Sequence, residues 1–414
     1  MKYGLIGKKL GHSFSKEVHA LLADYEYELL ELPDEAAVGK LLTKRRFCAI
    51  NVTIPYKETV IPYLDVISKE ARTMGAVNTV VNRDGKLYGY NTDFYGMTSA
   101  LARIGATDLS GMRAMILGTG GTALTARAVL HALGASSVIS VSRTPSGDII
   151  SYTDAVEKNN DVDILINTTP VGMFPSNENA PISLSHFTNL RYVFDAIYNP
   201  LSTVFVSEAT SRGISASGGL YMLVAQAFRA VELFLDKALP PVLLDDAYER
   251  ILRDKQNIVL IGMPSSGKTT IGRALALETG KVFCDLDAEI VSRAGKDIPT
   301  IFREEGEAGF RLKESEVIRD ISQKTGLIIA TGGGAVLRPE NVARLKRNGT
   351  LCFLDRPLAA LTPTADRPTA SDKEAIAQRY RERLPIYHAA ADRVFAVGED
   401  FKETVIAIRK ELSL

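Results

Sequence analysis

The sequence predicts an α/β fold built from more than one domain. Short apolar runs rich in β-branched residues alternate with longer stretches of helical periodicity, which is the pattern of βαβ units and parallel sheets. Two glycine-rich turns, at 118–123 and 262–267, each follow such a run and precede a helical stretch. The length of 414 residues is enough for two or three domains.

Composition and charge exclude several classes of protein. Hydrophobic residues make up 46% of the chain, and 49 basic side chains balance 49 acidic ones. A chain without net charge has no bulk field that would hold nucleic acid or an acidic membrane, so we expect neither as a partner. The three cysteines are widely spaced, which disfavours a disulfide framework or a zinc site and fits a reducing compartment.

Targeting signals are not evident in the sequence. The first ten residues lack the apolar core of a signal peptide, and no run of about 18 apolar residues could span a bilayer. We therefore expect a cytoplasmic protein whose partners are small molecules. Its oligomeric state is left open.

Six strands are expected in the first part of the chain, at 2–6, 49–54, 113–117, 137–141, 164–167 and 192–196. Pro240 and Pro241 end one helix, and the apolar stripe that follows over 243–252 predicts another. The polar segment 253–256 is the expected domain boundary.

The second part repeats the α/β pattern at smaller size. Strands are expected at 258–261, 281–284, 327–330 and 350–354. About 160 residues are ample for a separate core. We therefore place a smaller α/β domain at 256–414.

The turn at 118–123 fits the dinucleotide pattern GxGxxA, and we expect a helix over 123–133. Gly118 permits the tight turn, Gly120 lets the backbone approach a pyrophosphate, and Ala123 allows close helix packing. The helix start would then hold the phosphates. Such turns are common, so the motif alone does not decide the ligand.

The residues after the next strand bear on the choice of dinucleotide. Where an NAD-binding protein would carry an acidic residue, this chain has Ser142, Arg143 and Thr144. A guanidinium and two hydroxyls suit a 2′-phosphate, so NADP(H) is favoured over NAD(H). The alternative is that Arg143 is a solvated surface residue.

Four polar segments before residue 100, at 11–16, 51–57, 75–79 and 89–93, lie at strand ends or in turns. Lys57 beside Asp93 could transfer the proton that accompanies hydride transfer. Side chains within these segments would fix a small polyol or carboxylate, namely Ser13, Ser15, Thr53 and Asn78. Two alternatives stay open: the serines could cap a helix over 16–22, and the lysine and aspartate could form a surface ion pair.

Taken together, the segments HSFS, NVTIPYK, GAVNTV, GYNTD, GTGGTA, SRT, NTTPVGM and GGLYMLVAQA resemble shikimate dehydrogenase over about residues 1–254. The resemblance implies a substrate-binding domain over 1–100, completed by helices around 220–254, and a Rossmann NADP-binding domain over 101–219. Lys16 is a departure, because the family usually has proline there.

The same resemblance implies roles for individual residues. Lys57 and Asp93 would be the catalytic pair. The shikimate contacts would be Ser13, Ser15, Thr53, Lys57, Asn78, Asn91, Asp93, Tyr198 and Gln226. The NADP contacts would be Gly118, Gly120, Gly121, Thr122, Ala123, Ser142, Arg143, Thr144, Thr168, Gly219 and Met222.

The second glycine-rich turn, GMPSSGKT, fits the P-loop pattern GxxxxGK[ST] between a strand and a helix. Successive backbone N–H groups form a concavity for phosphate, Lys268 would reach the terminal phosphates, and the Thr269 hydroxyl would bind Mg²⁺. The ATP contacts are expected to be Gly262, Ser265, Ser266, Gly267, Lys268, Thr269 and Thr270.

Residues 256–414 resemble shikimate kinase, a P-loop domain of the nucleoside-monophosphate-kinase type. The resemblance implies that Asp285 assists Mg²⁺, that Asp287 holds the acceptor hydroxyl, and that Arg367 reaches the transferred phosphate from a lid. The remaining shikimate contacts would be Arg311, Gly332, Gly333, Gly334 and Arg383. One departure concerns adenine, because no arginine lies between Arg356 and Arg367 to stack on the base.

The two resemblances imply a bifunctional enzyme of aromatic amino-acid (chorismate) biosynthesis that uses NADP(H), ATP and Mg²⁺. It would reduce 3-dehydroshikimate to shikimate and then phosphorylate shikimate, with little direct transfer between the sites. The alternatives are a quinate/shikimate or NAD-linked dehydrogenase, and a P-loop domain with a regulatory or different kinase role.

Overall fold

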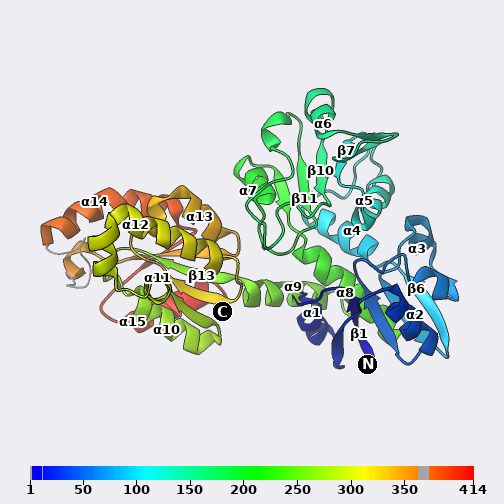
Figure 1. Cartoon of the computed structure of the whole chain (residues 1–414), viewed down its shortest axis with the longest axis horizontal. Coiled ribbons are helices and arrows are strands. Elements are labelled where there is room, and N and C mark those ends of the chain that lie inside the picture. Colours follow the sequence, from blue (N-terminus) through cyan, green and yellow to red (C-terminus); the bar gives the residue numbers. More distant parts are fainter. Residues whose placement is uncertain (1, 12, 362–372) are drawn as a thin grey trace. The chain divides into compact units, whose positions relative to one another are not determined.

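A computed structural model describes residues 2–11, 13–361 and 373–414. The chain divides into two compact units, the N-terminal unit Met1–Ile251 and the C-terminal unit Leu252–Leu414. Figure 1 shows that both units are α/β, with helices packed around central sheets.

The N-terminal unit begins with a mixed six-stranded sheet in the order β2-β1-β3-β5-β6-β4. Its strands are β1 (Tyr3–Gly7), β2 (Tyr27–Glu31), β3 (Ala49–Val52), β4 (Val66–Ile67), β5 (Thr79–Arg83) and β6 (Lys86–Tyr90). The alternating pattern predicts parallel pairing, and this sheet departs from it because β3–β5 and β5–β6 are antiparallel. Asp84 and Gly85 both have positive φ, of 51° and 82°, which suits the tight two-residue turn between β5 and β6.

Helices that cover this sheet are α1 (Ser15–Leu22), α2 (Glu35–Lys44) and α3 (Lys69–Met74), with a 3₁₀ turn η1 (Ile61–Tyr63). Asp34 caps α2 by accepting the N–H of Ala37. Val38 and Leu42 of this helix are fully buried in a core with Ile50 of β3. That core fixes the strand whose end leads into the segment 53–57.

The second sheet is wholly parallel, in the order β12-β11-β10-β7-β8-β9. Its strands are β7 (Arg113–Leu117), β8 (Ser137–Val141), β9 (Ile149–Ile150), β10 (Ile164–Asn167), β11 (Tyr192–Asp195) and β12 (Ser215–Ser217). Its helices are α5 (Gly121–Ala132), α6 (Tyr152–Lys158) and α7 (Val204–Ser211), with η2 (Leu184–His186). The strands expected at 113–117, 137–141 and 164–167 are confirmed at both ends. The helix expected from Ala123 begins two residues earlier.

Two further helices of this unit, α4 (Asp93–Arg103) and α8 (Leu220–Leu235), pack closely on each other. Gly96 permits the approach, since a Cβ there would lie 2.6 Å from the Met222 carbonyl oxygen. Helix α9 (Val242–Lys255) follows the two prolines. The polar segment 253–256 is therefore mostly the last turn of α9 rather than a separate linker, and Lys281 Nζ donates to the carbonyls of Arg253, Asp254 and Gln256.

The C-terminal unit has a parallel five-stranded sheet in the order β14-β15-β13-β16-β17. Its strands are β13 (Asn257–Ile261), β14 (Val282–Asp285), β15 (Leu327–Ala330), β16 (Gly349–Asp355) and β17 (Arg393–Ala396). Its helices are α10 (Lys268–Thr279), α11 (Leu286–Ala294), α12 (Ile298–Ile321), α13 (Pro339–Lys346), α14 (Lys373–Ala390) and α15 (Phe401–Glu411), with η3 (Ala335–Leu337) and η4 (Leu358–Ala360).

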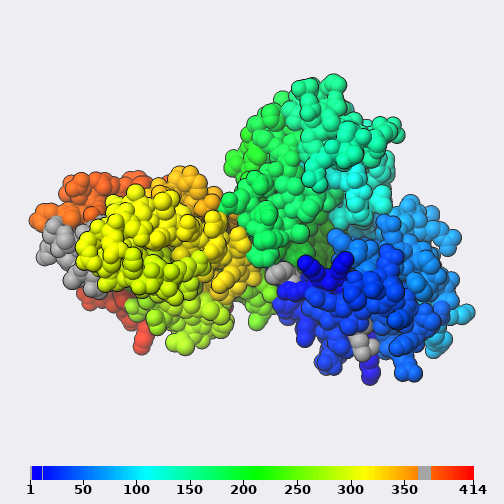
Figure 2. Space-filling view, viewed as in Figure 1, coloured from blue at the N-terminus to red at the C-terminus, as the bar shows by residue number. Residues whose placement is uncertain are grey.

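Strand β13 lies at the centre of this sheet and is buried along its whole length. Residues on its opposite faces pack into two cores, one around Val259 and Ile261 and the other around Ile258 and Leu260. The yellow side chains of α12 cover much of the face of this unit that Figure 2 shows. Over the described residues, no helix is long and apolar enough to cross a membrane.

Candidate active sites

Lys57 and Asp93 form a close ion pair in the N-terminal unit. Lys57 follows β3 and Asp93 begins α4, so two separate elements bring the charges together. Lys57 Nζ donates to Asp93 Oδ2 at 2.6 Å, and their side chains are only 20% and 12% exposed. Such burial distinguishes the pair from a solvated surface contact, which is the alternative that the sequence left open.

Neighbouring amides hold the aspartate in place. The Asp93 N–H donates to Asn91 Oδ1 at 3.0 Å, and Asn91 Nδ2 donates to the Ala76 carbonyl at 2.9 Å. Asn78 Oδ1 accepts the N–H of Thr92 at 2.8 Å. The start of α4 is thus tied to the segment 76–78, and the predicted contacts Asn78, Asn91 and Asp93 lie in one network.

The two serines lie at the start of α1, Ser15 as its first residue and Ser13 in the turn before it. Ser13 Oγ lies 3.0 Å from Ser15 Oγ and accepts the Ser15 N–H, while the residue at the cap position, Phe14, makes no side-chain cap. The Ser13 hydroxyl therefore belongs to a local turn before α1, and among its described residues the structure does not show the helix cap that was the alternative for the serines. The Phe14 ring lies 5.3 Å from that of Tyr198, whose pKa is raised by burial.

Other predicted substrate contacts come from separate elements. Thr53 follows β3, and its N–H donates to the Ile6 carbonyl. Gln226 lies on α8, where its Oε1 is 3.4 Å from Thr92 Oγ1 and its Nε2 donates to the Leu223 carbonyl. Gln226 is thereby linked to the network around Asn78.

The glycine-rich turn after β7 has the geometry of a dinucleotide turn. Gly118 has φ of 109°, and a Cβ there would lie 2.7 Å from Thr168 Oγ1. Gly120 and Gly121 have open space where a side chain would be, so a ligand can approach the backbone. Thr168 Oγ1 donates to the Leu117 carbonyl at 2.7 Å, which ties β10 to this turn.

Further residues of the predicted NADP set border the same sheet. Arg143 and Thr144 are exposed after β8, and Ser142 Oγ accepts the Thr144 N–H. Gly219 precedes α8, and a Cβ there would overlap the Ala196 carbonyl. Met222 is buried on α8, whereas Thr122 and Ala123 lie in the first turn of α5.

In the C-terminal unit, the P-loop connects β13 to α10. Gly262, Ser265 and Gly267 all have positive φ, of 150°, 64° and 95°. Lys268 Nζ donates to the carbonyls of Gly262 at 2.9 Å and Met263 at 2.7 Å. The Lys268 ammonium therefore lies against the same loop whose backbone is predicted to bind phosphate.

The two residues predicted to serve Mg²⁺ lie together. Thr269 Oγ1 donates to Asp285 Oδ2 at 2.9 Å. The other oxygen of Asp285 caps α11 by accepting the N–H groups of Asp287 and Ala288. A hydroxyl and a carboxylate are donors that Mg²⁺ accepts in proteins.

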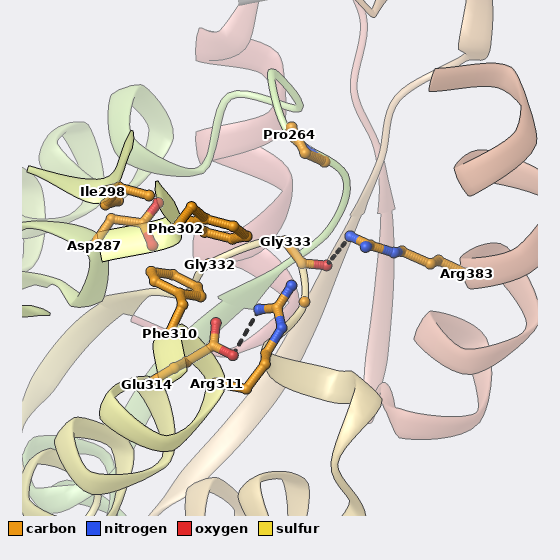
Figure 3. A pocket seen from close by; sticks show the side chains of 11 residues that line it. Pro264, Asp287, Ile298, Phe302, Phe310, Arg311, Glu314, Gly332, Gly333 and Arg383 are labelled. Carbon is orange, nitrogen blue, oxygen red and sulfur yellow. Dashed lines mark hydrogen bonds and ion pairs between the residues drawn. The ribbon is translucent and has the colours of Figure 1, made fainter. Parts of the chain in front are cut away.

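A pocket beside the P-loop gathers the predicted acceptor contacts (Figure 3). It is lined by Pro264, Asp287, Ile298, Phe302, Phe310, Arg311, Glu314, Gly332, Gly333, Gly334 and Arg383. Arg311 donates to Glu314 at 2.8 Å, and Arg383 donates to the Gly333 carbonyl at 3.0 Å. Two guanidinium groups from α12 and α14 thus border one glycine turn.

The glycines of this turn are required by close contacts. A Cβ on Gly334 would overlap the Arg311 guanidinium, and one on Gly332 would lie within 3 Å of both Glu314 Oε1 and Asp287 Oδ1. The Tyr387 hydroxyl also donates to the Gly333 carbonyl. The turn therefore lets arginine and carboxylate side chains approach a shared space.

Comparisons with known proteins agree with this geometry in the N-terminal unit. Residues 5–80 match the family model of the shikimate dehydrogenase substrate binding domain. A shikimate dehydrogenase (NADP(+)) from Clostridium beijerinckii is 38% identical over 261 residues, which span 59% of this chain and 96% of that protein. The chain belongs to the shikimate dehydrogenase family. Residues 264–412 match the shikimate kinase family model, so the C-terminal unit carries a shikimate kinase domain.

Solved structures of this dehydrogenase family share the fold. The chorismate mutase/shikimate 5-dehydrogenase fusion protein from Clostridium acetobutylicum is 34% identical, with a TM-score of 0.57 over 60% of this chain and 96% of its own. Shikimate 5-dehydrogenase from Thermus thermophilus in complex with NADP(H) and shikimate is 32% identical, with a TM-score of 0.54 over 60% and 98%. The dehydrogenase matches of the N-terminal unit and the kinase family match of the C-terminal unit together support a bifunctional shikimate-pathway enzyme.

Sequence reasoning missed Glu314 and the aromatic wall of the kinase pocket, Phe302 and Phe310. Glu314 lies three residues after Arg311 on one helix, a spacing that places the two side chains side by side and could have indicated the pair. Burial raises the pKa of Glu314, and the Arg311 guanidinium opposes that shift.

The predicted lid arginine, Arg367, lies outside the described residues. Arg356, which precedes the stretch without arginine, lies with its guanidinium carbon 5.0 Å from the centre of the Phe401 ring. Its Nη1 is 3.4 Å from the Ser265 carbonyl, and the Phe401 ring also packs against the position of Gly267. A cation and an aromatic ring therefore flank the P-loop.

Proposed function

We propose that this chain catalyses two consecutive reactions of the shikimate pathway. The N-terminal unit reduces 3-dehydroshikimate to shikimate with NADPH, and the C-terminal unit phosphorylates shikimate with ATP to shikimate 3-phosphate. The observation that carries the proposal is that each unit brings together groups suited to one of the two reactions: the Lys57–Asp93 ion pair in one, and a P-loop beside two guanidinium groups in the other.

In the reduction, Lys57 donates a proton to the C3 carbonyl oxygen, and Asp93 keeps the ammonium oriented at 2.6 Å. When bound, NADPH supplies the hydride that reaches the carbonyl carbon. Hydroxyl, amide and phenol groups around this pair orient the substrate, namely Ser13, Ser15, Thr53, Asn78, Asn91, Tyr198 and Gln226.

NADPH is the preferred cofactor in this proposal. The turn at 118–123 leaves room for a pyrophosphate at Gly120 and Gly121. The exposed Arg143 guanidinium would pair with the 2′-phosphate, with help from the Ser142 and Thr144 side chains. Thr168, Gly219 and Met222 border the path toward the nicotinamide.

In the phosphorylation, Asp287 orients the 3-hydroxyl of shikimate for in-line attack, while Arg311 and Arg383 hold its carboxylate. Lys268 leaves its own loop carbonyls and pairs with the phosphates of ATP. Thr269 and Asp285 would hold Mg²⁺, which neutralises phosphate charge when bound. Arg367 is assigned to the transferred phosphate by its place in the sequence.

Two variants assayed separately test the proposal. Lys57→Ala removes the proton donor, so we expect the rate of NADPH oxidation with 3-dehydroshikimate to fall by at least about 100-fold while phosphorylation persists. Lys268→Ala is expected to abolish phosphorylation and spare the reduction. A Lys268→Ala chain that keeps full kinase activity would contradict the P-loop assignment.

Substrate comparisons separate the alternatives in the N-terminal unit. We expect kcat/KM to be higher for shikimate than for quinate, because the Ser13 and Ser15 positions match the shikimate enzyme. We also expect it to be higher for NADP⁺ than for NAD⁺, because the Arg143 guanidinium suits a 2′-phosphate. Charge reversal by Arg143→Glu is expected to reduce the preference for NADP⁺. An unchanged ratio would instead mean that Arg143 is a solvated side chain.

A further inference from the structure

A line of buried polar side chains lies behind Asn78, and the proposed reduction does not use it. Tyr27 on β2 donates its hydroxyl to Asn51 Oδ1 on β3 at 2.7 Å. Asn51 Nδ2 in turn donates to Thr79 Oγ1 on β5 at 3.1 Å. The three residues are 3%, 5% and 0% exposed, so water does not substitute for these bonds.

A backbone carbonyl, which can only accept hydrogen bonds, fixes the direction of the hydrogen bonds in this line. Asn51 Nδ2 also lies 3.3 Å from the backbone carbonyl of Asn78, which has no hydrogen to give, so the Asn51 amide must present its NH₂ group there. Its Oδ1 then accepts from Tyr27. Because the Thr79 oxygen accepts from Asn51, its own hydrogen is available to donate onward.

Thr79 donates that hydrogen to Asn78 Oδ1 at 3.0 Å. The backbone N–H of Thr92 donates to the same oxygen at 2.8 Å. The Thr92 hydroxyl is a third donor within reach, at 3.2 Å, so the two lone pairs of this oxygen are occupied by groups of the protein. Among the described residues, Asn78 Nδ2 makes one bond, to Thr92 Oγ1 at 3.1 Å, which leaves its second N–H as the group with capacity for a ligand.

We propose that Thr79, held by Asn51 and Tyr27, is a positioning residue that makes Asn78 a hydrogen-bond donor toward the substrate of the dehydrogenase. The inference rests on the proposed function, because it takes Asn78 as a substrate contact. Without the Thr79 hydroxyl, Asn78 Oδ1 keeps only the donors of Thr92, its backbone N–H at 2.8 Å and its hydroxyl at 3.2 Å, so the amide is held less firmly in this orientation. A substrate oxygen at that point would then meet a donor that is less well positioned.

Thr79→Val is the direct test, because valine keeps the shape and removes the hydroxyl. In the reverse reaction, we expect the KM for shikimate to rise about tenfold, while the KM for NADP⁺ stays within about twofold. Thr79→Ser should restore the wild-type KM. Tyr27→Phe, at the far end of the line, should raise the KM for shikimate in the same direction but less.

Three controls distinguish positioning from loss of folding. The KM for NADP⁺ reports on the N-terminal unit itself, so a value within about twofold of wild type shows that this unit is intact. The kinase activity of the same chain measures the amount of chain in the assay, and it should not change in any of these variants. Thr404→Val makes the same substitution at a buried threonine of the C-terminal unit, and it should leave the KM for shikimate of the dehydrogenase unchanged.

The outcomes separate this inference from the proposed function. An active wild-type enzyme whose Thr79→Val variant keeps its KM for shikimate contradicts the inference alone. Equal changes in the KM values for shikimate and NADP⁺, or no rescue by serine, also contradict it. A wild-type chain that does not oxidise shikimate contradicts the proposed function, and the inference with it.

Discussion

At the scale of single residues, Glu314 lies between Arg311 and the glycine turn at Gly332 in the kinase pocket. Its Oε2 accepts from Arg311 Nη1 at 2.8 Å, and the residue is fully buried on α12. Its Oε1 has no hydrogen-bond partner within the described part of the chain, although it lies beside the position of Gly332 and near Asp287 (Figure 3). A buried carboxylate oxygen without a partner is costly unless a bound molecule or water satisfies it.

We expect Glu314→Gln to weaken shikimate binding in the kinase. The variant removes the charge that holds Arg311, so the guanidinium is less fixed for the substrate carboxylate. The KM for shikimate in phosphorylation should rise about tenfold, with a smaller effect on kcat. Glu316→Gln, an exposed position on the same helix, is the matched control and should leave both constants unchanged. Identical constants for the two variants would mean that Glu314 has no part in binding.

Site residues differ in how far the sequence could predict their arrangement. The glycine-rich turns 118–123 and 262–267 could be predicted from the sequence, because a backbone that a phosphate approaches closely needs glycine at fixed spacings. The bonds of the Lys268 ammonium to the Gly262 and Met263 carbonyls could not be predicted, because the motif fixes the type of residue and not the partners of its side chain. The Tyr27–Asn51–Thr79 line was missed because it joins three strands that are distant in sequence.

At the scale of elements, Asp195 at the end of β11 ties two loops of the N-terminal unit together. It is fully buried and accepts from Thr203 Oγ1 at 2.7 Å, Asn167 Nδ2 at 3.0 Å and the Ile197 N–H at 3.1 Å. Burial raises the pKa of Asp195 from its ordinary value of 3.8 to about 6, although these three bonds oppose the shift.

The sign of this shift predicts how stability depends on pH. Between about pH 4 and 6, folded protein keeps a proton that the unfolded chain has lost, so this residue makes the unit less stable as pH rises through that window. Above pH 6, the raised pKa of Asp195 lowers the free energy of unfolding by about 3 kcal/mol. The substitution Asp195→Asn removes the titrating group, so the difference in unfolding free energy between wild type and this variant isolates its contribution.

Calorimetry can measure that difference. The unfolding transition of the N-terminal unit is identified by its upward shift with NADPH, and it is followed from pH 4.5 to 7.5 in both proteins. We expect the wild-type transition to fall relative to that of Asp195→Asn as pH rises toward 6. Parallel curves across this range would show that Asp195 does not titrate there.

Elements of the fold were predictable where local pattern and burial agree. Strands β7, β8, β10 and β15 have the predicted bounds because each is an apolar run in the interior of a parallel sheet. The β5–β6 hairpin was missed even though Asp84-Gly85 is a recognised turn signal. Its strands carry Asn82, Arg83 and Lys86 next to the turn, and these polar side chains interrupt the apolar pattern.

At the scale of the whole molecule, the two units have separate cores. The clusters around Ile50, Met115 and Tyr27 lie entirely within Met1–Ile251. Those around Val259 and Ile258 lie entirely within Leu252–Leu414. Each unit can therefore hold its own site, and a substitution at one site should not disturb the chemistry of the other.

Separate sites predict complementation between two inactive chains. Neither Lys57→Ala nor Lys268→Ala alone should convert 3-dehydroshikimate to shikimate 3-phosphate. An equimolar mixture should do so, because shikimate released by one chain reaches the other through solvent. The measurement is the yield of phosphorylated product with NADPH and Mg-ATP. A mixture that makes shikimate but does not phosphorylate it would mean that the intermediate must pass within one chain.

The most direct measurement is mass analysis of the products that the wild-type chain forms from 3-dehydroshikimate with NADPH and Mg-ATP. We expect shikimate 3-phosphate, with one NADPH oxidised and one ATP consumed for each molecule. Omission of ATP should leave shikimate as the product. Accumulation of shikimate in the presence of Mg-ATP, or no reduction at all, would contradict the assignment of two activities to this chain.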